Sequence, residues 1–101
     1  MGKYTLTDDA KQDVEEIKAY SMETWNRETA KAYLTGMRLA IQRLADNPGI
    51  GEDASDNTWP GVRSWPYERH YIFFVPNPEG VTVVGILHQS RLPKAFKKRA
   101  P

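Results

Sequence analysis

Apolar residues recur every three to four positions through the first half of the chain, which is the period of an amphipathic α-helix. One such pattern follows Thr7, a typical N-cap residue, and Asp8 and Asp9 stand in its first turn, where the helix dipole favours negative charge. A second, cleaner pattern follows Asn26 and ends at Asn47-Pro48-Gly49, because proline disfavours helix in the residue before it and glycine permits a turn. These patterns predict an antiparallel pair of helices with one broad apolar stripe.

The second half of the chain changes to the pattern of β-strands, and both faces of these strands are apolar. Residues 62–67, 70–76 and 81–88 are predicted as strands, with a hairpin turn at 77–80, and a weaker alternation predicts a short edge strand over residues 3–7. A strand with one face in water should alternate apolar and polar residues. The helical hairpin can cover one face of so small a sheet, so we expect a shallow apolar groove on the other, covered by a partner chain.

The composition predicts a single soluble domain over residues 1–101, with 40% hydrophobic and 27% charged residues. No apolar run approaches the roughly 20 residues of a membrane span, and residues 1–6 lack the apolar stretch of a signal peptide. We therefore expect a cytoplasmic protein. The absence of cysteine excludes disulfides and thiolate metal sites, and the two histidines have no metal-ligand spacing, so neither a metal nor a cofactor is expected.

Charge is distributed unevenly along the chain. Residues 1–59 carry 7 Lys+Arg and 11 Asp+Glu, a balance of −4, whereas residues 60–101 carry 7 and 2, a balance of +5. The second half ends in a basic tail at about 91–101 that includes Arg91, Lys94, Lys97, Lys98 and Arg99. Such a tail suits an acidic partner, either nucleic acid or an acidic protein surface; the alternative is a solvated tail that only aids solubility.

The candidate chemistry of the sequence is limited to one small group of residues. His88 closes the last predicted strand, and with Arg63, Arg69 and Arg91 it would form a phosphate-handling group, in which histidine donates a proton and arginine stabilises phosphoryl charge. Such a group is typical of RNA cleavage. The sequence has no Ser-His-Asp set in motif context, no Gly-rich phosphate loop and no dinucleotide fingerprint.

Short sequence pieces spread over residues 4–91 resemble the ParE toxins of the RelE/ParE superfamily, the toxin half of type II toxin–antitoxin pairs. They stand in the order of the family: Tyr4-Thr5-Leu6-Thr7, Ala10 to Tyr20, Trp25 with Ala30 and Tyr33, Leu44 to Pro48 with Gly51, Gly61 to Ser64, His70 to Phe74, and Ile86 to His88. The resemblance implies an α+β fold of order β-α-α-β-β-β. In it an N-terminal strand is followed by an antiparallel helical hairpin packed on one face of a small antiparallel sheet.

The resemblance also implies two partners, a ParD-like antitoxin and a cellular target. ParE-like members are understood to poison DNA gyrase and block replication, whereas RelE-like relatives cleave mRNA on the ribosome. Residues 44–62 contain no Lys or Arg and several acids, and His88 is followed by Gln89 rather than the tyrosine of some superfamily RNases. We therefore expect a gyrase inhibitor without a catalytic site, and no direct nucleic-acid binding outside a gyrase–DNA complex. The alternatives are a ribosome-dependent endoribonuclease using Arg63, His88 and Arg91, and a non-toxic co-repressor.

Two sets of contact residues follow from this interpretation. The target is expected to meet the basic C-terminal third and its neighbours, namely Arg63, Trp65, His88, Arg91, Lys94, Lys97 and Lys98. The antitoxin is expected to meet apolar strand residues, namely Tyr71, Phe73, Val84 and Ile86. Because both faces of these strands are apolar, the sequence leaves open which face meets the helical hairpin.

Overall fold

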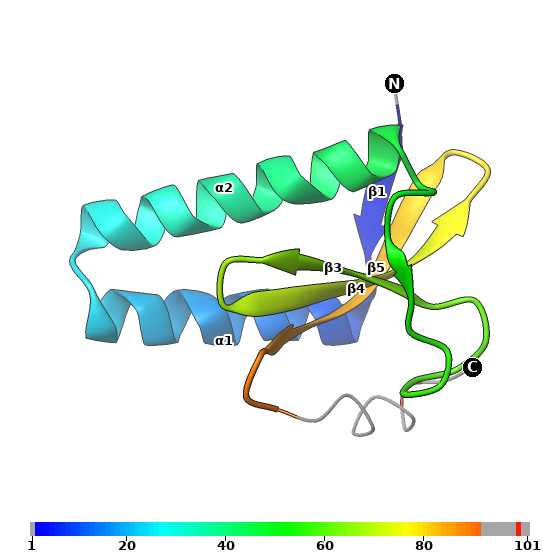
Figure 1. The fold of residues 1–101 in the computed structure, drawn as a ribbon. Helices are drawn as coiled ribbons and strands as arrows, with labels where there is room; N and C mark the ends of the chain where they lie inside the picture. The colour runs from blue at the N-terminus through cyan, green and yellow to red at the C-terminus, as the bar shows by residue number, and fades with distance from the viewer. Residues whose placement is uncertain (1, 92–98, 100–101) are drawn as a thin grey trace.

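The computed structural model describes residues 2–91 and 99, which form two helices and a five-stranded sheet (Figure 1). The elements are β1 (Lys3–Leu6), α1 (Asp8–Thr24), α2 (Arg27–Asp46), β2 (Glu52–Asp53), β3 (Arg63–Tyr67), β4 (His70–Asn77) and β5 (Gly80–His88). The strand order is β1-β5-β4-β3-β2. The predicted α+β fold and its element order are thereby confirmed. None of the helices within residues 2–91 is long and apolar enough to cross a membrane.

Two details of the sheet differ from the sequence-based prediction. The sheet is mixed rather than wholly antiparallel, because β1 runs parallel to β5 with Lys3 beside Gly80 and Leu6 beside Val83. The short strand β2 lies inside the segment predicted as a loop and pairs with the start of β3. The sequence pattern indicates neither the parallel pairing of β1, which is only four residues long, nor the strand β2, which consists of two exposed acids.

The helices begin where the cap residues predict. The Thr7 side chain accepts a hydrogen bond from the backbone N–H of Ala10 at 3.1 Å, and the Asn26 side chain accepts one from Thr29 at 2.8 Å. Each bond satisfies one of the N–H groups that the first turn of a helix leaves without a partner. Trp25 and Asn26, the two residues between the helices, therefore let α2 fold back antiparallel to α1 (Figure 1).

The main core lies between the helical hairpin and one face of the sheet. The helices contribute Ala10, Ile17, Met37, Ile41, Leu44 and Ala45, and the strands contribute Ile72, Phe74, Val81, Val83 and Ile86. Fully burying one such Val, Leu, Ile or Phe side chain stabilises the fold by roughly 1.5–3 kcal/mol. This cluster fixes the hairpin on the sheet.

A β-bulge changes the register between β4 and β5. Phe74 pairs with Val83 but Phe73 pairs with Gly85, so Val84 is the extra residue on β5. As a result Val83 and Ile86 both face the helical hairpin, while Val84 packs in a second cluster on the opposite face. The bulge explains why the side chains of β5 do not alternate strictly.

The second face of the sheet is partly covered by the chain itself. Ala54 and Val62, which bracket the segment between β2 and β3, pack with Phe73, Val84 and Leu87. The backbone N–H of Ala54 donates to the Val62 carbonyl at 2.9 Å and closes the segment. The prediction of an open apolar groove on this face is therefore wrong here, because apolar residues within an otherwise acidic segment fold back over the strands.

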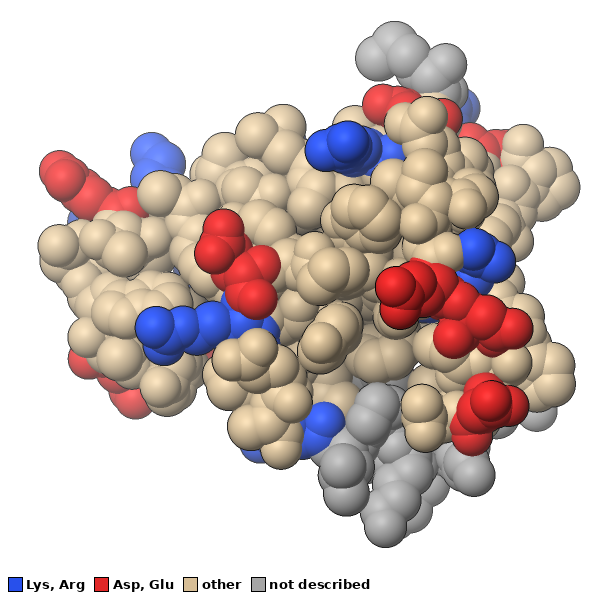
Figure 2. Space-filling model, in the orientation of Figure 1, with Lys and Arg blue, Asp and Glu red and all other residues tan. Residues whose placement is uncertain are grey.

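The acidic side chains of the same segment face outward. Glu52, Asp53 and Asp56 are exposed, and Figure 2 shows acidic side chains gathered over β2 and the segment that follows it. This part of the surface is therefore negative, with apolar side chains beneath it.

Candidate partner-binding site

A cluster of aromatic and histidine side chains lies where β4 begins and β5 ends. His70 and His88 stand opposite each other in the ladder, and their ring centroids are 5.3 Å apart at an interplanar angle of 90°. The Tyr33 hydroxyl lies 2.6 Å from Nδ1 of His70, and the Tyr67 hydroxyl donates to the Tyr33 backbone carbonyl at 2.8 Å. The cluster ties α2 to three strands, counting His88 on β5.

The ionisation of this cluster follows from its burial. Burial and then the neighbouring His88 lower the pKa of His70 from 6.5 to about 4, so its ring is neutral at neutral pH. Burial also raises the pKa of the Tyr33 hydroxyl, which therefore keeps its proton at neutral pH and is available to donate a hydrogen bond to Nδ1 of the neutral His70 ring. A neutral, hydrogen-bonded histidine here is a structural anchor.

His88, which is half-buried like His70, stands at the rim of a groove of about 1100 Å³ between α1 and the end of β5. The backbone N–H of Ser90 donates to Nδ1 of His88 at 3.1 Å, and the backbone N–H of Arg91 donates to the His88 carbonyl at 2.9 Å. These bonds form a turn that places Arg91, which is exposed, at the same rim.

Carboxylates of α1 form the opposite wall of the groove. Asp9, Asp13 and Glu16 line it, and Arg99 lies against them. Arg99 donates two hydrogen bonds to Asp13, at 2.8 and 3.1 Å, and a third to the Val84 carbonyl at 3.1 Å. The same Asp13 carboxylate accepts the backbone N–H of Ile86 at 3.0 Å. Arg99 and Asp13 therefore bind backbone groups of Val84 and Ile86, which lie on β5 at and beside the bulge.

Arg63 stands at the other end of the sheet from His88. It pairs with Phe74 in the ladder, whereas Tyr67, four residues further along β3, pairs with His70. At about 3.3 Å per residue this separates Arg63 from the histidine end by about 13 Å. Its guanidinium donates to the backbone carbonyls of Gly49 and Gly51 and so holds the segment after α2. The predicted RNase grouping of Arg63, His88 and Arg91 is therefore not assembled.

Comparison with known proteins identifies the family. Residues 4–93 match the family described as the ParE toxin of type II toxin–antitoxin system, parDE. The chain belongs to the ParE toxin family. It is 36% identical over 88 residues to Toxin ParE1 of Mycobacterium tuberculosis, covering 86% of this chain and 89% of that protein. It is 33% identical over 90 residues to Toxin ParE of Escherichia coli, covering 88% and 86%.

The fold of the ParE family is also recovered by comparison of structures. A chain of the chromosomal ParDE toxin–antitoxin system from P. aeruginosa superposes with a TM-score of 0.73, covering 87% of this chain and 96% of that chain. The two are 18% identical in sequence, so this likeness concerns the fold alone.

Residues 2–91 and 99 contain no group of three or more His, Cys, Asp or Glu that could hold a metal ion.

The residues predicted for the ParE target surface are not gathered in one place. His88 and Arg91 share the groove rim, but Arg63 is at the far end of the sheet and Trp65 packs half-buried against the hairpin-side core. Lys94, Lys97 and Lys98 lie outside the described residues. A target surface built from the described part of this set is therefore limited to the rim.

The four residues predicted for antitoxin contact are divided between the two faces of the sheet. Tyr71 is 41% exposed, whereas Phe73 is 3% exposed and Val84 lies with it in the second cluster. Ile86 is buried against the helical hairpin, so its inclusion in one outer surface is wrong. The cause is the bulge at Val84, which turns Ile86 to the opposite face from the one that simple alternation predicts.

Sequence reasoning missed the contacts that hold the groove together. The Tyr33–His70 hydrogen bond joins residues 37 positions apart, and the Asp13–Arg99 pair joins residues 86 positions apart. The resemblance included Asp13, Tyr33 and His70 but gave no indication of what they bind. An acid on the buried edge of a helix is the one signal that could have indicated a specific partner for Asp13.

Proposed function

We propose that this chain is a toxin that inhibits DNA gyrase, and thereby DNA replication, and that a ParD-like antitoxin neutralises it in the cytoplasm. The observation that carries the proposal is membership of the ParE family, supported by relatives named as ParE toxins over nearly their whole length. The separation of Arg63 from His88 and Arg91 also supports a toxin that acts by binding, since catalysis of phosphoryl transfer needs these groups at one site.

The proposed gyrase contact is the rim of the groove together with the basic tail. Arg91 is exposed beside His88, and the tail adds Lys94, Lys97 and Lys98, which lie outside the described residues. A cationic rim of this kind would meet an acidic surface of the gyrase–DNA complex. For the antitoxin, Tyr71 is the one residue of the predicted set that remains exposed for contact.

The proposal is tested by titrating the purified chain, freed of antitoxin, into a gyrase supercoiling and DNA-cleavage assay. We expect loss of supercoiling and accumulation of cleaved DNA, both reversed by the antitoxin. Arg91→Glu should weaken inhibition about fivefold or more, as expected for a charge at the rim of an interface. Arg43→Glu makes the same change of charge on α2 and serves as the matched control. Gyrase that is unaffected by the folded chain would refute the proposal.

A ribosome-dependent endoribonuclease is the second candidate, favoured by the pair of histidines beside the groove. Asp9, Asp13 and Glu16 on the opposite wall would repel an RNA phosphate, which disfavours this candidate. Loss of growth inhibition in His88→Ala, together with mRNA cleavage by the wild type in a ribosome assay, would replace the gyrase proposal.

A further inference from the structure

Two exposed arginines belong to neighbouring turns at the end of the sheet that carries His70 and His88. Arg69 stands in the turn between β3 and β4, and Arg91 follows the end of β5. The backbone N–H of Gln89 donates to the Arg69 carbonyl at 2.8 Å, and the backbone N–H of Arg91 donates to the His88 carbonyl at 2.9 Å. These two bonds join the turns, so both arginine side chains start from the same end of the sheet.

The turn that carries Arg69 is fixed by its own backbone. The loop between β3 and β4 consists of Glu68 and Arg69 alone. Glu68 has a φ of 51°, the left-handed conformation that two-residue hairpin loops favour at the first of their two residues. The backbone amide of Arg69 interacts with the Tyr33 hydroxyl, and its carbonyl accepts from Gln89. The turn is therefore tied both to α2 and to the end of β5, and Arg69 extends from a defined position.

The side chains at this end of the sheet are hydrogen-bond donors. Arg69 and Arg91 are exposed, and neither guanidinium forms an ion pair or hydrogen bond with the described residues 2–91 and 99. Nδ1 of His88 accepts the backbone N–H of Ser90, so the neutral ring carries its proton on Nε2. Two guanidinium groups and one imidazole N–H therefore lie close together, and an anion is the ligand that such a set of donors fits.

We propose that Arg69 and Arg91 together bind one carboxylate of an acidic protein segment of the target, DNA gyrase, with the His88 ring beside it. This inference rests on the proposed function and names the chemistry that the rim of the groove recognises. A guanidinium donates two parallel hydrogen bonds to a carboxylate, and a carboxylate accepts about four, so two arginines satisfy one carboxylate. Arginine is also enriched among the residues that contribute most to affinity at protein interfaces.

The surrounding charges favour a single carboxylate over the phosphate backbone of a nucleic acid. Glu68 precedes Arg69 in the turn, and Glu16 lines the groove wall opposite the rim that carries Arg91. A discrete anion fits between these acids, whereas an extended polyanion would pass over them and be repelled. Tyr20, which is 61% exposed and lines the same groove, adds an aromatic contact of the kind that protein interfaces contain.

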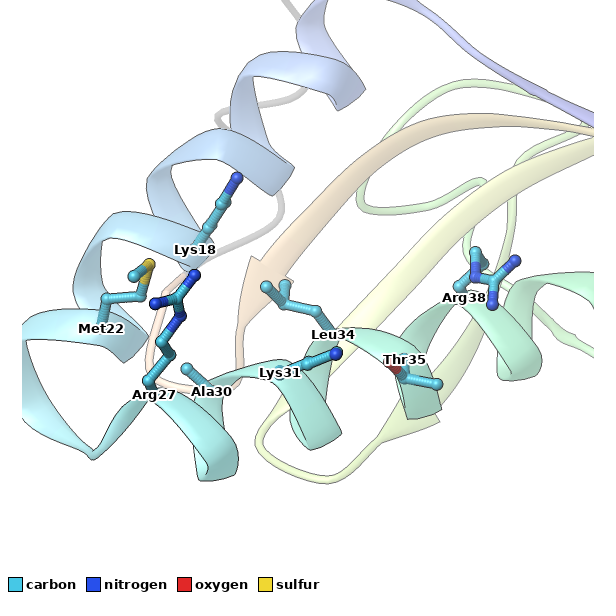
Figure 3. Close-up of a pocket in the computed structure, with 8 residues that line it drawn as sticks. All are labelled: Lys18, Met22, Arg27, Ala30, Lys31, Leu34, Thr35 and Arg38. Carbon is cyan, nitrogen blue, oxygen red and sulfur yellow. The ribbon is translucent and has the colours of Figure 1, made fainter.

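A second group of exposed cations supplies the matched control. Four cations line a groove of about 440 Å³ on the outer surface of the helical hairpin, namely Lys18, Arg27, Lys31 and Arg38 (Figure 3). No Asp or Glu lines this groove, and none of its residues lines the groove beside His88. Lys18→Gln/Lys31→Gln therefore removes two positive charges, as Arg69→Gln/Arg91→Gln does, but from a different surface.

The test measures inhibition of gyrase supercoiling by the purified chain, freed of antitoxin, over a range of toxin concentrations. Arg69→Gln and Arg91→Gln should each raise the concentration for half-inhibition about tenfold, as expected for loss of charge-assisted hydrogen bonds. The double variant should be at most about 30-fold weaker than the wild type, below the roughly 100-fold product of two independent contacts, because both arginines bind one carboxylate. The control should inhibit within about threefold of the wild type.

A binding measurement with gyrase free of DNA separates a carboxylate of the protein from a phosphate of the DNA. The double variant should bind DNA-free gyrase more weakly than the wild type does, by about the same factor as in the supercoiling assay. Equal affinity of the two chains for DNA-free gyrase would assign the arginines to the DNA and overturn the inference.

The remaining outcomes separate the inference from the proposed function, with every variant shown to be folded by circular dichroism. Single variants as active as the wild type, or a double variant weakened by the full product of the singles, would overturn the shared carboxylate and leave the proposed function intact. A wild type that does not inhibit gyrase would instead remove the proposed function. Unchanged gyrase inhibition together with lost ribosome-dependent mRNA cleavage in the double variant would assign the arginines to an RNA phosphate and overturn the inference.

Discussion

Asp13 should be the polar residue of the helices whose loss destabilises this fold most, because it holds both the C-terminal Arg99 and the bulged strand β5. Its side chain is 11% exposed, and its two oxygens accept from Arg99 at 2.8 and 3.1 Å. It also accepts the backbone N–H of Ile86 at 3.0 Å. Asp13→Ala removes all three hydrogen bonds at once and leaves a part-buried N–H without this acceptor.

The size of the effect can be worked out from these contacts. An unsatisfied buried N–H costs about 1–3 kcal/mol, and a partly exposed ion pair contributes about 1 kcal/mol. Asp13→Ala should therefore lower the free energy of unfolding by about 2–4 kcal/mol. Arg99→Gln, which leaves the Ile86 contact in place, should lower it by about 1 kcal/mol. For a domain of this size the first change corresponds to a fall in Tm of about 10–20 °C.

Urea denaturation of the purified toxin, without antitoxin, measures both values. Asp9→Ala is the matched control, because Asp9 is 61% exposed and 3.9 Å from Arg99, so its loss should change stability by less than about 0.5 kcal/mol. The double variant should show a coupling of about 1 kcal/mol between Asp13 and Arg99. If Asp13→Ala and Arg99→Gln destabilise equally, the Ile86 hydrogen bond contributes nothing and the reasoning is refuted.

Three further predictions concern contacts that sequence reasoning did not find. His70 titrates near 6.5 when unfolded and near 4 when folded, so the unfolded chain binds more protons between these values and stability should fall as the pH falls from 6.5 toward 4. After allowance for solvent screening this loss is about 1–2 kcal/mol and should be absent in His70→Gln, as read from urea midpoints across the pH range. Tyr33→Phe removes the 2.6 Å hydrogen bond to His70 and should lower stability by about 1 kcal/mol in the same assay, less than Tyr33→Ala, which also removes the ring contacts. Thr58→Val removes a buried hydroxyl that donates to the Ala54 carbonyl at 2.6 Å; we expect a loss of about 1–2 kcal/mol by thermal denaturation, and no loss would mean that this bond does not hold the segment.

The helices and strand limits could be predicted from the sequence because their signals are local. Thr7 and Asn26 cap the helices through bonds to residues three positions away, and the Asn47-Pro48-Gly49 stop needs no distant contact. The three long strands begin and end within one residue of the predicted limits for the same reason. Cap and turn chemistry depends on residues that are neighbours in sequence, so a single sequence contains it.

The site could not be predicted, because it depends on one extra residue in β5. Counting back from the turn, where Asn77 pairs with Gly80, an unbulged hairpin pairs His70 with Leu87. The bulge at Val84 moves the register by one, so that His88 stands opposite His70 instead. A shift of one residue also moves a side chain to the other face, which is why Val84 and Ile86 separate. The bulge lies within an uninterrupted apolar run, and the periodicity of that run contains no sign of it.

Charge summed along the sequence was also a poor guide to charge on the surface. The first 59 residues have a balance of −4, yet Lys18, Arg27, Lys31 and Arg38 within them form a groove that no acid lines. Arg99, counted with the basic tail, is bound to Asp13 of α1, so part of the difference between the halves is an internal contact. Helical folding sorts charges by face, with a period of 3.6 residues, and a sum over a segment averages that period away. For this fold the faces of the hairpin, more than the halves of the chain, determine where charge of one sign gathers on the surface.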